Sequence, residues 1–329
     1  MALKETDIRP VDLHDEYIRL SAVDAAGIFA IGHRHKINCP ACGSDDQRQA
    51  FTKSDFNYVE CVTCYSLYQS PRPEEATFEK FYSNSTSADF WATEFFPKVA
   101  EPRRKLIYRP RAEKIMEYCQ RYGVGVNNLI DVGAGYGLFL EEWKKIAPSA
   151  RLRAVEPGKK LASLCRAKEF EVLESTAENA AAWQGTAELV TCFEVFEHSY
   201  NPLAFVTSLY DLAKPDGLVV LTTLGVDGFD IQTLWSKSKS ISPPHHINFL
   251  SVAGFEILFK RIGFREVEII TPGKLDVDIV INYAKANPEF ELPAFFKKMM
   301  MRGEPALQDF QNYLSAHKLS SHTWIIAKK

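Results

Sequence analysis

The chain has 329 residues, of which 46% are hydrophobic, and its formal net charge is −3. This length allows one large domain together with a small one, and the composition is typical of a globular protein. No apolar run approaches the roughly 18 residues that span a bilayer, and the N-terminus lacks the apolar stretch of a signal peptide, so we expect a cytoplasmic protein with no membrane partner. The acidic balance argues against a general polyanion binder, which makes a nucleic acid an unexpected partner.

The first 73 residues fall into two predicted segments. In residues 1–36, apolar positions recur imperfectly at helical spacing and predict a helix over residues 11–30. Residues 37–73 carry two Cys-x-x-Cys pairs separated by 18 residues. The four cysteines are Cys39, Cys42, Cys61 and Cys64. This spacing favours one tetrahedral zinc ion over two disulfide bonds or chance, and we predict a structural zinc because all four positions serve as ligands.

Residues 74–122 are predicted to form an aromatic and helical connector and cap. Phe, Tyr and Trp are dense between about residues 74 and 100, which favours buried packing between domains and leaves open a lid over a substrate. Residues 103–121 are expected to form a helix with several cations, for which a solvated face is favoured over a phosphate-binding surface.

From residue 123 to residue 329, predicted strands and helices alternate. The strands are expected near 128–132, 151–155, 170–174, 188–193 and 217–223, and the helices near 137–147, 158–168, 177–183, 201–213 and 251–262. Such alternation predicts a mostly parallel sheet with helices on both faces and ligands beyond the carboxyl ends of its strands. Two further strands are expected over 264–271 and 322–327. Two or three extra helices in the insertion 273–318 are interpreted as a substrate-side cap, a surface for a homodimer, or core packing.

A glycine-rich turn joins the predicted strand at 128–132 to the following helix. Its three glycines are Gly133, Gly135 and Gly137. Without Cβ atoms, such a turn lets backbone N–H groups approach a ligand closely. Glu156 follows at roughly the spacing expected of a carboxylate that binds ribose hydroxyls. The dinucleotide fingerprint is Gly-x-Gly-x-x-Gly, whereas this chain has Asp131-x-Gly-x-Gly-x-Gly.

That turn resembles motif I of class I S-adenosylmethionine-dependent methyltransferases. The resemblance implies an α/β fold: a Rossmann-like seven-stranded sheet with helices on both faces and a last strand, around 324–326, that lies antiparallel between its neighbours. It also implies S-adenosylmethionine as cofactor. Asp131 would order the loop and the methionine end, the three glycines would admit the cofactor, and Glu156 would accept both ribose hydroxyls. The adenine loop would comprise Thr176, Ala177 and Glu178.

The predicted fourth strand ends in two carboxylates and an imidazole within residues 191–198, Thr-Cys-Phe-Glu-Val-Phe-Glu-His. Such crowding at a strand end is hard to explain as core packing. The segment resembles the Glu-x-x-Glu-His sequence of many class I methyltransferases, including the quinone-biosynthesis O-methyltransferases. By that resemblance Phe193 and Glu194 border the cofactor, whereas Glu197 and His198 face the substrate.

His245 and His246 lie in the loop after the predicted fifth strand, within Pro-Pro-His-His-Ile-Asn-Phe-Leu-Ser at 243–251. That loop is expected to cover the same pocket. Methyl transfer is an in-line displacement in which an acceptor proton is often removed, and imidazole has a suitable intrinsic pKa. We predict one of three histidines as general base, His246 slightly ahead of His245 with His198 the third, and a purely orienting role stays open.

The same side chains allow a second divalent ion. Glu194, Glu197, His198 and one of the two loop histidines make a two-carboxylate, two-imidazole set. This set is similar to the metal site of small-RNA 2′-O-methyltransferases, where the metal holds ribose hydroxyls. The acidic net charge and the lack of an evident RNA-binding module argue against that substrate class.

Over about residues 37–271, the zinc module, aromatic connector, glycine turn and Pro-Pro-His-His loop together resemble a bacterial family of zinc-bearing methyltransferases. Such proteins are similar to sugar C-methyltransferases and to enzymes of polysaccharide or secondary-metabolite pathways. The resemblance implies methyl transfer to a small hydroxylated metabolite such as a nucleotide-linked sugar. The tyrosine-rich substrate residues of the sugar enzymes have no match here, so C- and O-transfer stay open. Two alternatives remain, an RNA methyltransferase guided by the zinc module and a non-catalytic binding protein on the same fold.

Overall fold

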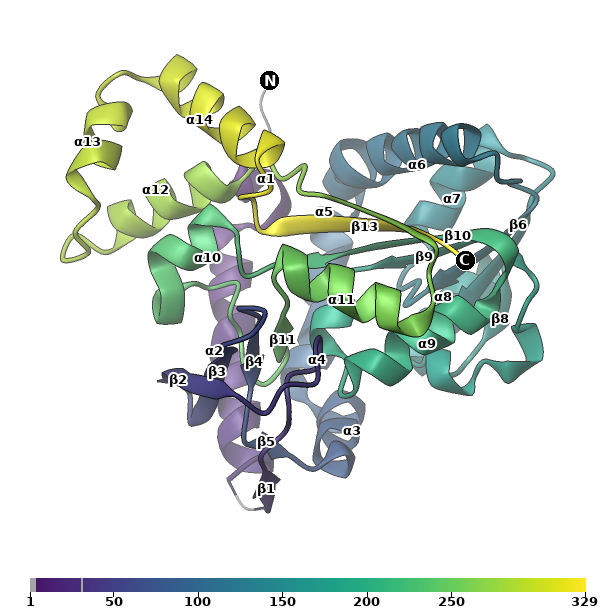
Figure 1. Cartoon of the computed structure of the whole chain (residues 1–329), viewed down its shortest axis with the longest axis horizontal. Helices are drawn as coiled ribbons and strands as arrows, with labels where there is room; N and C mark the ends of the chain where they lie inside the picture. The colour runs from purple at the N-terminus through teal and green to yellow at the C-terminus, as the bar shows by residue number, and fades with distance from the viewer. Residues whose placement is uncertain (1–3, 31) are drawn as a thin grey trace.

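The structure is a computed structural model and describes residues 4–30 and 32–329. Figure 1 shows a large α/β part at the right, a small β-rich part at the bottom, and a helical part at the upper left that is coloured yellow-green. Among the described residues, no helix is long and apolar enough to cross a membrane.

A seven-stranded sheet forms the centre of the α/β part. Its strands are β6 (Asn128–Val132), β7 (Arg151–Val155), β8 (Glu171–Leu173), β9 (Ala187–Phe193), β10 (Ala213–Leu224), β12 (Glu266–Ile270) and β13 (His322–Lys328). Their spatial order is β12-β13-β10-β9-β6-β7-β8. The five strands from β10 to β8 run parallel, whereas β13 is antiparallel to both β10 and β12. The predicted sheet is confirmed, including the antiparallel last strand.

Helices cover both faces of this sheet because successive residues of a buried strand point to opposite sides. Leu129 packs with α6 (Arg109–Tyr122) and α7 (Leu138–Ile146), whereas Ile130 packs with α9 (Pro202–Leu212) and α11 (Val252–Ile262). α8 (Lys159–Ala167) follows β7. Ser251 caps α11, since its hydroxyl accepts the backbone N–H of Gly254 at 2.9 Å.

The helix predicted over residues 177–183 is wrong. The structure has two separate 3₁₀ turns there, η3 (Ala177–Asn179) and η4 (Ala181–Trp183). Ala177 and Ala180 are buried while the residues around them are mostly exposed. Ala177 and Ala180 are three residues apart, the spacing that places side chains on the same side of a 3₁₀ turn. Burial of these two small side chains is too little to stabilise a longer α-helix.

The cysteine-rich part is built on a four-stranded antiparallel sheet. It comprises β2 (Gln47–Lys53), β3 (Phe56–Cys61), β4 (Leu67–Gln69) and β11 (Asn248–Phe249), in the order β11-β4-β3-β2. Within the cysteine-rich segment the sequence predicts short strands at 56–59 and 66–68, and these correspond to β3 and β4. The sequence did not indicate β2 or β11. β11 comes from the loop that carries His245 and His246, so this loop is hydrogen-bonded to the cysteine-rich part.

The N-terminal helices and the connector wrap around both parts. They are α1 (Glu5–Ile8), α2 (Val11–Ile28), β1 (Arg34–His35), β5 (Arg72–Pro73), α3 (Glu75–Asn84), α4 (Thr86–Phe90), the π-helix η1 (Trp91–Phe95), α5 (Phe96–Arg103) and the π-helix η2 (Arg104–Tyr108). Packing of the aromatic connector is confirmed at Phe81, Phe95 and Phe96, which are buried. Phe96 stacks on Tyr136 of the glycine turn at 4.4 Å between ring centres. The lid stays a prediction.

The insertion before β13 contains three helices and has an apolar cluster of its own. They are α12 (Asp276–Ala286), α13 (Ala294–Met300) and α14 (Glu304–Ala316), and they pack against α10 (Phe229–Leu234), which a 3₁₀ turn, η6 (Trp235–Lys237), follows. Phe296 is buried in this cluster, whereas 73% of Phe295 and 78% of Met301 is exposed. Core packing therefore explains part of the insertion's apolar content, and the cap and the dimer surface stay predictions.

Candidate active site

A crevice is expected where the strand order of the large sheet reverses. β6 lies between β9 and β7, and such switch points bind ligands at the carboxyl ends of the strands. Thr191 on β9 donates a hydrogen bond to Oδ1 of Asp131 on β6 at 2.7 Å, and both side chains are buried. Burial raises the pKa of Asp131 to about 7, although the hydrogen bond from Thr191 and the charge of Arg111 oppose the shift.

The glycine turn lies directly after β6. Gly133, Gly135 and Gly137 have φ angles of +70°, +56° and +67°, which L-residues with a Cβ atom adopt at a cost. A Cβ atom on Gly133 would lie 2.4 Å from Cγ2 of Val195, in the segment after β9. The turn therefore needs glycine at position 133 both for its backbone conformation and for its contact with the neighbouring strand end.

Glu156, at the end of β7, points back to this turn. Its Oε2 accepts the backbone N–H of Gly135 at 2.8 Å, and its Oε1 accepts that of Gly158 at 2.9 Å. Burial raises the pKa of Glu156, while the two N–H groups partly offset that rise. The sequence predicted a carboxylate near the glycine turn, and the structure brings the two together.

The segment expected to hold adenine follows β8, the strand next to β7. Ala177 is buried at the start of η3, whereas Thr176 and Glu178 are exposed. The backbone N–H of Glu156 donates to the carbonyl of Leu173 at 3.0 Å, which joins the ends of β7 and β8. Thr176, Ala177 and Glu178 therefore lie at the same edge of the sheet as Glu156.

Glu194 follows β9 with a φ angle of +56°. The hydroxyl of Thr222 donates to its Oε1 at 2.7 Å, and Arg111 and His322 lie 3.4 Å from the same oxygen. Burial alone would raise the pKa of Glu194, but His322, Arg111 and Thr222 outweigh burial and hold it at about 2. Glu194 is therefore an ionised carboxylate with three partners of its own.

Sequence reasoning missed two of these partners. Arg111 was expected on a solvated helix face, but only 5% of it is exposed, and its guanidinium lies 4.5 Å from the ring centre of Phe193. The helical spacing of Arg111 to the buried Ile115 is a signal that could have placed it inward. Arg103 is also turned inward, over the rings of Trp91 and Phe96, so the predicted solvated face is wrong for both arginines. Apart from its position at the start of β13, nothing in the sequence indicated that His322 lies beside Glu194.

Glu197, His198 and His246 meet in one cluster. One possible ligand atom of each lies within 4.8 Å of those of the other two. The rings of His198 and His246 are 4.8 Å apart between centres. The short 3₁₀ turn η5 (Phe196–His198) supplies two members of the cluster and the loop before β11 supplies the third. The structure thus brings together three of the four residues that we singled out for catalysis.

Hydrogen bonds fix the orientation of both imidazoles in this cluster. Nδ1 of His198 lies 2.9 Å from the carbonyl oxygen of His245, and Nδ1 of His246 lies 2.6 Å from that of Ser240. A carbonyl oxygen only accepts, so each Nδ1 carries the proton and each Nε2 keeps its lone pair. Burial lowers the pKa of His198 to about 3 and that of His246 to about 4, so both rings are neutral near pH 7.

The carboxyl group of Glu197 is held in the same cluster. The hydroxyl of Thr223 donates to its Oε2 at 2.7 Å, and only 2% of the residue is exposed. Burial, together with the charge of Glu194, raises the pKa of Glu197 to about 8. Glu194 and Glu197 therefore have opposite pKa shifts although they are three residues apart.

His245 faces away from this cluster. Its Nε2 lies 3.4 Å from the hydroxyl of Ser87, and its ring packs 4.7 Å from that of Phe81 and 5.3 Å from that of Tyr17. Burial lowers its pKa well below the usual value. The sequence placed both loop histidines over one pocket, but the structure gives them different surroundings. Its Nε2 is therefore directed away from the cluster, but its ring lies 6.2 Å from that of His198 between centres and its backbone carbonyl accepts from Nδ1 of His198.

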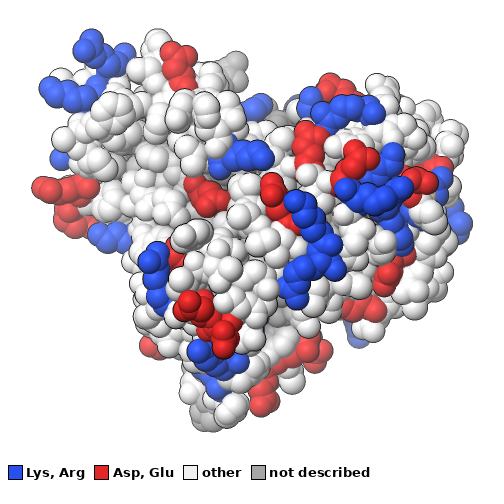
Figure 2. Space-filling model, viewed as in Figure 1, with Lys and Arg blue, Asp and Glu red and all other residues white. Residues whose placement is uncertain are grey.

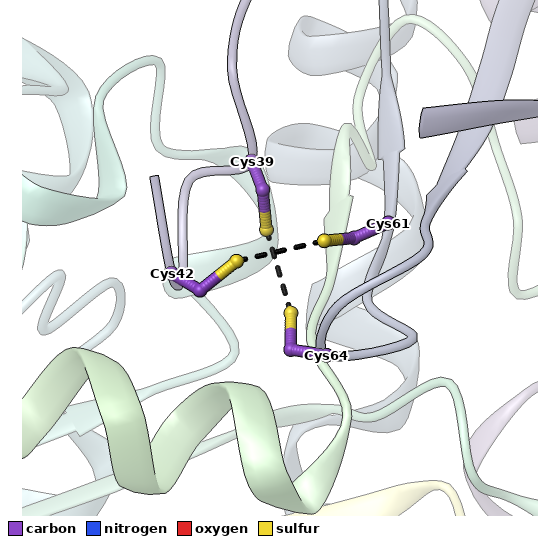
Figure 3. Close-up of side chains that lie close together, drawn as sticks. All are labelled: Cys39, Cys42, Cys61 and Cys64. Carbon is purple, nitrogen blue, oxygen red and sulfur yellow. Dashed lines mark hydrogen bonds between the residues drawn. The ribbon is translucent and has the colours of Figure 1, made fainter. Parts of the chain in front are cut away.

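The four cysteines of the small part lie close together. Figure 3 shows their sulfur atoms directed toward a common centre. Sγ of Cys39 is 3.5 Å from that of Cys64, and Sγ of Cys42 is 3.5 Å from that of Cys61. These distances far exceed a disulfide bond of about 2.05 Å and are close to the spacing of four sulfurs that are each about 2.3 Å from one zinc ion. The four side chains therefore fit tetrahedral zinc.

Residues 95–269 match the profile of a protein family described as "Methyltransferase domain". The matched region includes the glycine turn, Glu156, and all three members of the cluster, and it spans more than half of the chain. The chain belongs to this methyltransferase family. The resemblance drawn from the Asp131–Gly137 segment is thereby confirmed, while the cysteines lie outside the matched region.

Curated relatives include ubiquinone biosynthesis O-methyltransferases. The chain is 34% identical over 115 residues to that of Vibrio campbellii (strain ATCC BAA-1116), which covers 31% of this chain and 46% of the relative. It is 27% identical over 155 residues to that of Xanthomonas campestris pv. campestris (strain B100), which covers 43% of this chain and 64% of the relative. The chain thus matches about half to two thirds of the length of these relatives.

Among solved structures, the plantazolicin methyltransferase BamL, in complex with a triazolic desmethylPZN analog and SAH, has a TM-score of 0.50. The alignment covers 77% of this chain and 94% of BamL at 14% sequence identity. This likeness supports the methyltransferase fold of the chain.

Proposed function

We propose that this protein transfers a methyl group from S-adenosylmethionine to a small hydroxylated metabolite. The observation that carries the proposal is the arrangement at the carboxyl end of the sheet. The glycine turn and Glu156 follow neighbouring parallel strands, and the cluster of Glu197, His198 and His246 lies after the adjoining strand. In this proposal a cofactor site and two imidazoles with available Nε2 lone pairs are side by side, as methyl transfer requires.

In this proposal the cofactor lies along the ends of β6, β7 and β8. Asp131 orders the turn, and Gly133, Gly135 and Gly137 admit the cofactor. Glu156 exchanges its two backbone N–H partners for the two ribose hydroxyls. Thr176, Ala177 and Glu178 border the adenine, and Phe193 and Glu194 border the end with the sulfonium.

On the acceptor side, Nε2 of an imidazole takes the proton. The acceptor oxygen forms a bond to the methyl carbon, the bond between that carbon and the sulfonium sulfur breaks, and the hydroxyl proton moves to Nε2. His246 and His198 have an available Nε2 lone pair, whereas that of His245 faces Ser87. We therefore favour His246 and His198 over His245. The curated relatives are named O-methyltransferases, which supports transfer to oxygen.

A negatively charged acceptor, such as a nucleotide-linked sugar, suits the cations around the cluster. The charge of Arg9 acts on Glu194, Glu197 and His246, and no described residue forms an ion pair with it. Glu194 is already paired with Arg111. An anionic group on the acceptor would offset the charge of Arg9.

The first test is the affinity of the purified protein for S-adenosylhomocysteine (SAH), measured by calorimetry in the wild type and in Glu156→Ala. We expect the substitution to weaken binding by about 1–3 kcal/mol, or roughly 5- to 150-fold, through loss of charge-assisted hydrogen bonds. Glu113→Ala, at an exposed position on α6, is the matched control and should bind SAH like the wild type. Equal affinities of Glu156→Ala and the wild type would contradict the ribose assignment.

The second test follows a labelled methyl group into candidate acceptors. Label in a hydroxylated metabolite supports the proposal. Label in RNA, together with RNA binding that weakens steeply as salt is raised, would favour an RNA methyltransferase instead. Tight SAH binding without transfer to any acceptor of a broad panel would favour a binding protein on the methyltransferase fold.

A further inference from the structure

We propose that Glu197, His198 and His246 bind one divalent cation, at a site separate from the four cysteines. Binding of the cation follows from the geometry of these three side chains alone. Its use in methyl transfer rests on the function proposed above.

The first argument is the spacing of the three side chains. Their possible ligand atoms lie within 4.8 Å of one another, and no hydrogen bond joins any two of these described side chains. Two ligands of one cation, each about 2.1 Å from it, lie at most about 4.2 Å apart. A shift of less than about 1 Å therefore brings all three atoms to coordination distance.

The second argument is the orientation of the imidazoles. Both rings donate Nδ1–H to a backbone carbonyl and keep a lone pair on Nε2. Metal-binding histidines almost always have such an outer partner, which fixes the tautomer and the direction of the ring. Glu197 has a comparable partner in Thr223. Each of the three expected ligands is thus held by a neighbour that does not itself reach the cation.

The third argument is that the structure narrows the ligand set. Of the five candidate residues that the sequence offered for this set, Glu194 is already held by Thr222, Arg111 and His322. His245 faces Ser87. Two imidazoles and one carboxylate remain, and all three are largely sheltered from solvent.

This ligand set suits a first-row divalent metal ion such as Mn²⁺, Fe²⁺, Co²⁺ or Zn²⁺. Three protein ligands leave coordination positions open, as in catalytic metal sites. A hydroxyl oxygen of the acceptor would take an open position, and a bound cation lowers the pKa of such an oxygen. The two imidazoles would then serve as ligands rather than as general bases.

The experiment uses the full-length, zinc-loaded protein after dialysis against buffer free of other divalent ions. Mn²⁺ is the probe because it prefers nitrogen and oxygen ligands to thiolates, and electron paramagnetic resonance measures the free ion. We expect one Mn²⁺ per wild-type chain and a dissociation constant at least tenfold higher in Glu197→Gln and in His246→Gln. His317→Gln, at an exposed histidine that follows α14, is the matched control and should bind Mn²⁺ like the wild type.

No Mn²⁺ binding by the wild type would overturn the inference, as would equal affinity in the wild type, Glu197→Gln and His246→Gln. Equal loss in His317→Gln would show that the effect is not specific to the cluster and would overturn the assignment of His246 as a ligand. SAH affinity, measured in the same samples, keeps the two proposals apart. Mn²⁺ binding with the expected pattern but without SAH binding supports the metal site and contradicts the proposed function. SAH binding without Mn²⁺ binding contradicts the metal site and leaves the proposed function supported.

Discussion

Two carboxylates three residues apart illustrate how the surroundings of a residue determine its chemistry. Glu194 has Arg111 and His322 beside it, which keep its pKa at about 2, whereas burial and the charge of Glu194 raise the pKa of Glu197 to about 8. Pairs of titratable groups with pKa values shifted in opposite directions are typical of catalytic sites. The sequence shows both residues but not their partners, because Arg111 and His322 are distant along the chain. The different roles of Glu194 and Glu197 therefore emerge only from the fold.

At the residue scale, Gly133→Ala tests the contact between the glycine turn and the strand end beside it. The new Cβ would lie 2.4 Å from Cγ2 of Val195, and the φ angle of +70° adds a cost of about 1–2 kcal/mol. We expect at least a tenfold loss of SAH affinity by calorimetry. Gly133→Ala with Val195→Ala should recover part of that loss, because the second substitution removes the clash but not the backbone cost. No recovery in the double variant would contradict the contact.

At the scale of elements, strands and helices that follow from local sequence patterns were predictable. Elements that exist because they pair with a distant part of the chain were not. β6 and β7 have the predicted bounds because each is a short segment between turn signals in a regular alternation of strands and helices. β11 has only two residues, and it is a strand because Asn248 pairs with Tyr68 of β4. The opposite directions of His245 and His246 follow from that pairing and from the carbonyl of Ser240, which accepts from His246. Neither the pairing of β11 with β4 nor the hydrogen bond from His246 to Ser240 can be inferred from composition or from residue spacing.

A buried carboxyl pair joins α10 to the helical insertion and makes stability depend on pH. Asp230 and Asp276 are both buried, and burial together with the charge of Asp276 raises the pKa of Asp230 well above its usual value. The folded chain therefore keeps a proton that the unfolded chain releases above about pH 4. Consequently the free energy of unfolding should fall as pH rises toward the folded pKa, by up to about 1.4 kcal/mol per pH unit.

Asp230→Asn should flatten this dependence, because an amide does not titrate. Urea unfolding at about pH 5 and about pH 8 measures the difference, and we expect the wild type to lose more stability over this interval than the variant. Asp309→Asn, at an exposed position on α14, is the matched control and should lose as much as the wild type. Parallel losses in all three proteins would contradict a raised pKa at Asp230.

At the scale of the whole molecule, the cysteine-rich part and the methyltransferase sheet share one core. Cys39, Cys61 and Cys64 lie in the same apolar cluster as Phe255 and Leu258 of α11. The hydroxyl of Ser251 also donates to the carbonyl of Cys64. Figure 1 shows β11, at the edge of the small sheet, beside α11. Figure 2 shows basic and acidic side chains interspersed over one face of the molecule.

This shared core makes a prediction about zinc. If the cysteine-rich part were independent, Cys39→Ser would destabilise that part alone. Because the core is continuous, we expect one calorimetric transition for the whole chain, and loss of one zinc ligand should lower its midpoint by roughly 5–10 °C, for a cost of about 3 kcal/mol. Cys119→Ser, between α6 and the sheet, leaves the zinc ligands intact and should retain the metal. Two transitions in the wild type, of which only one shifts in Cys39→Ser, would show that the zinc module unfolds separately. In that case the ordering of the His246 loop would not depend on zinc.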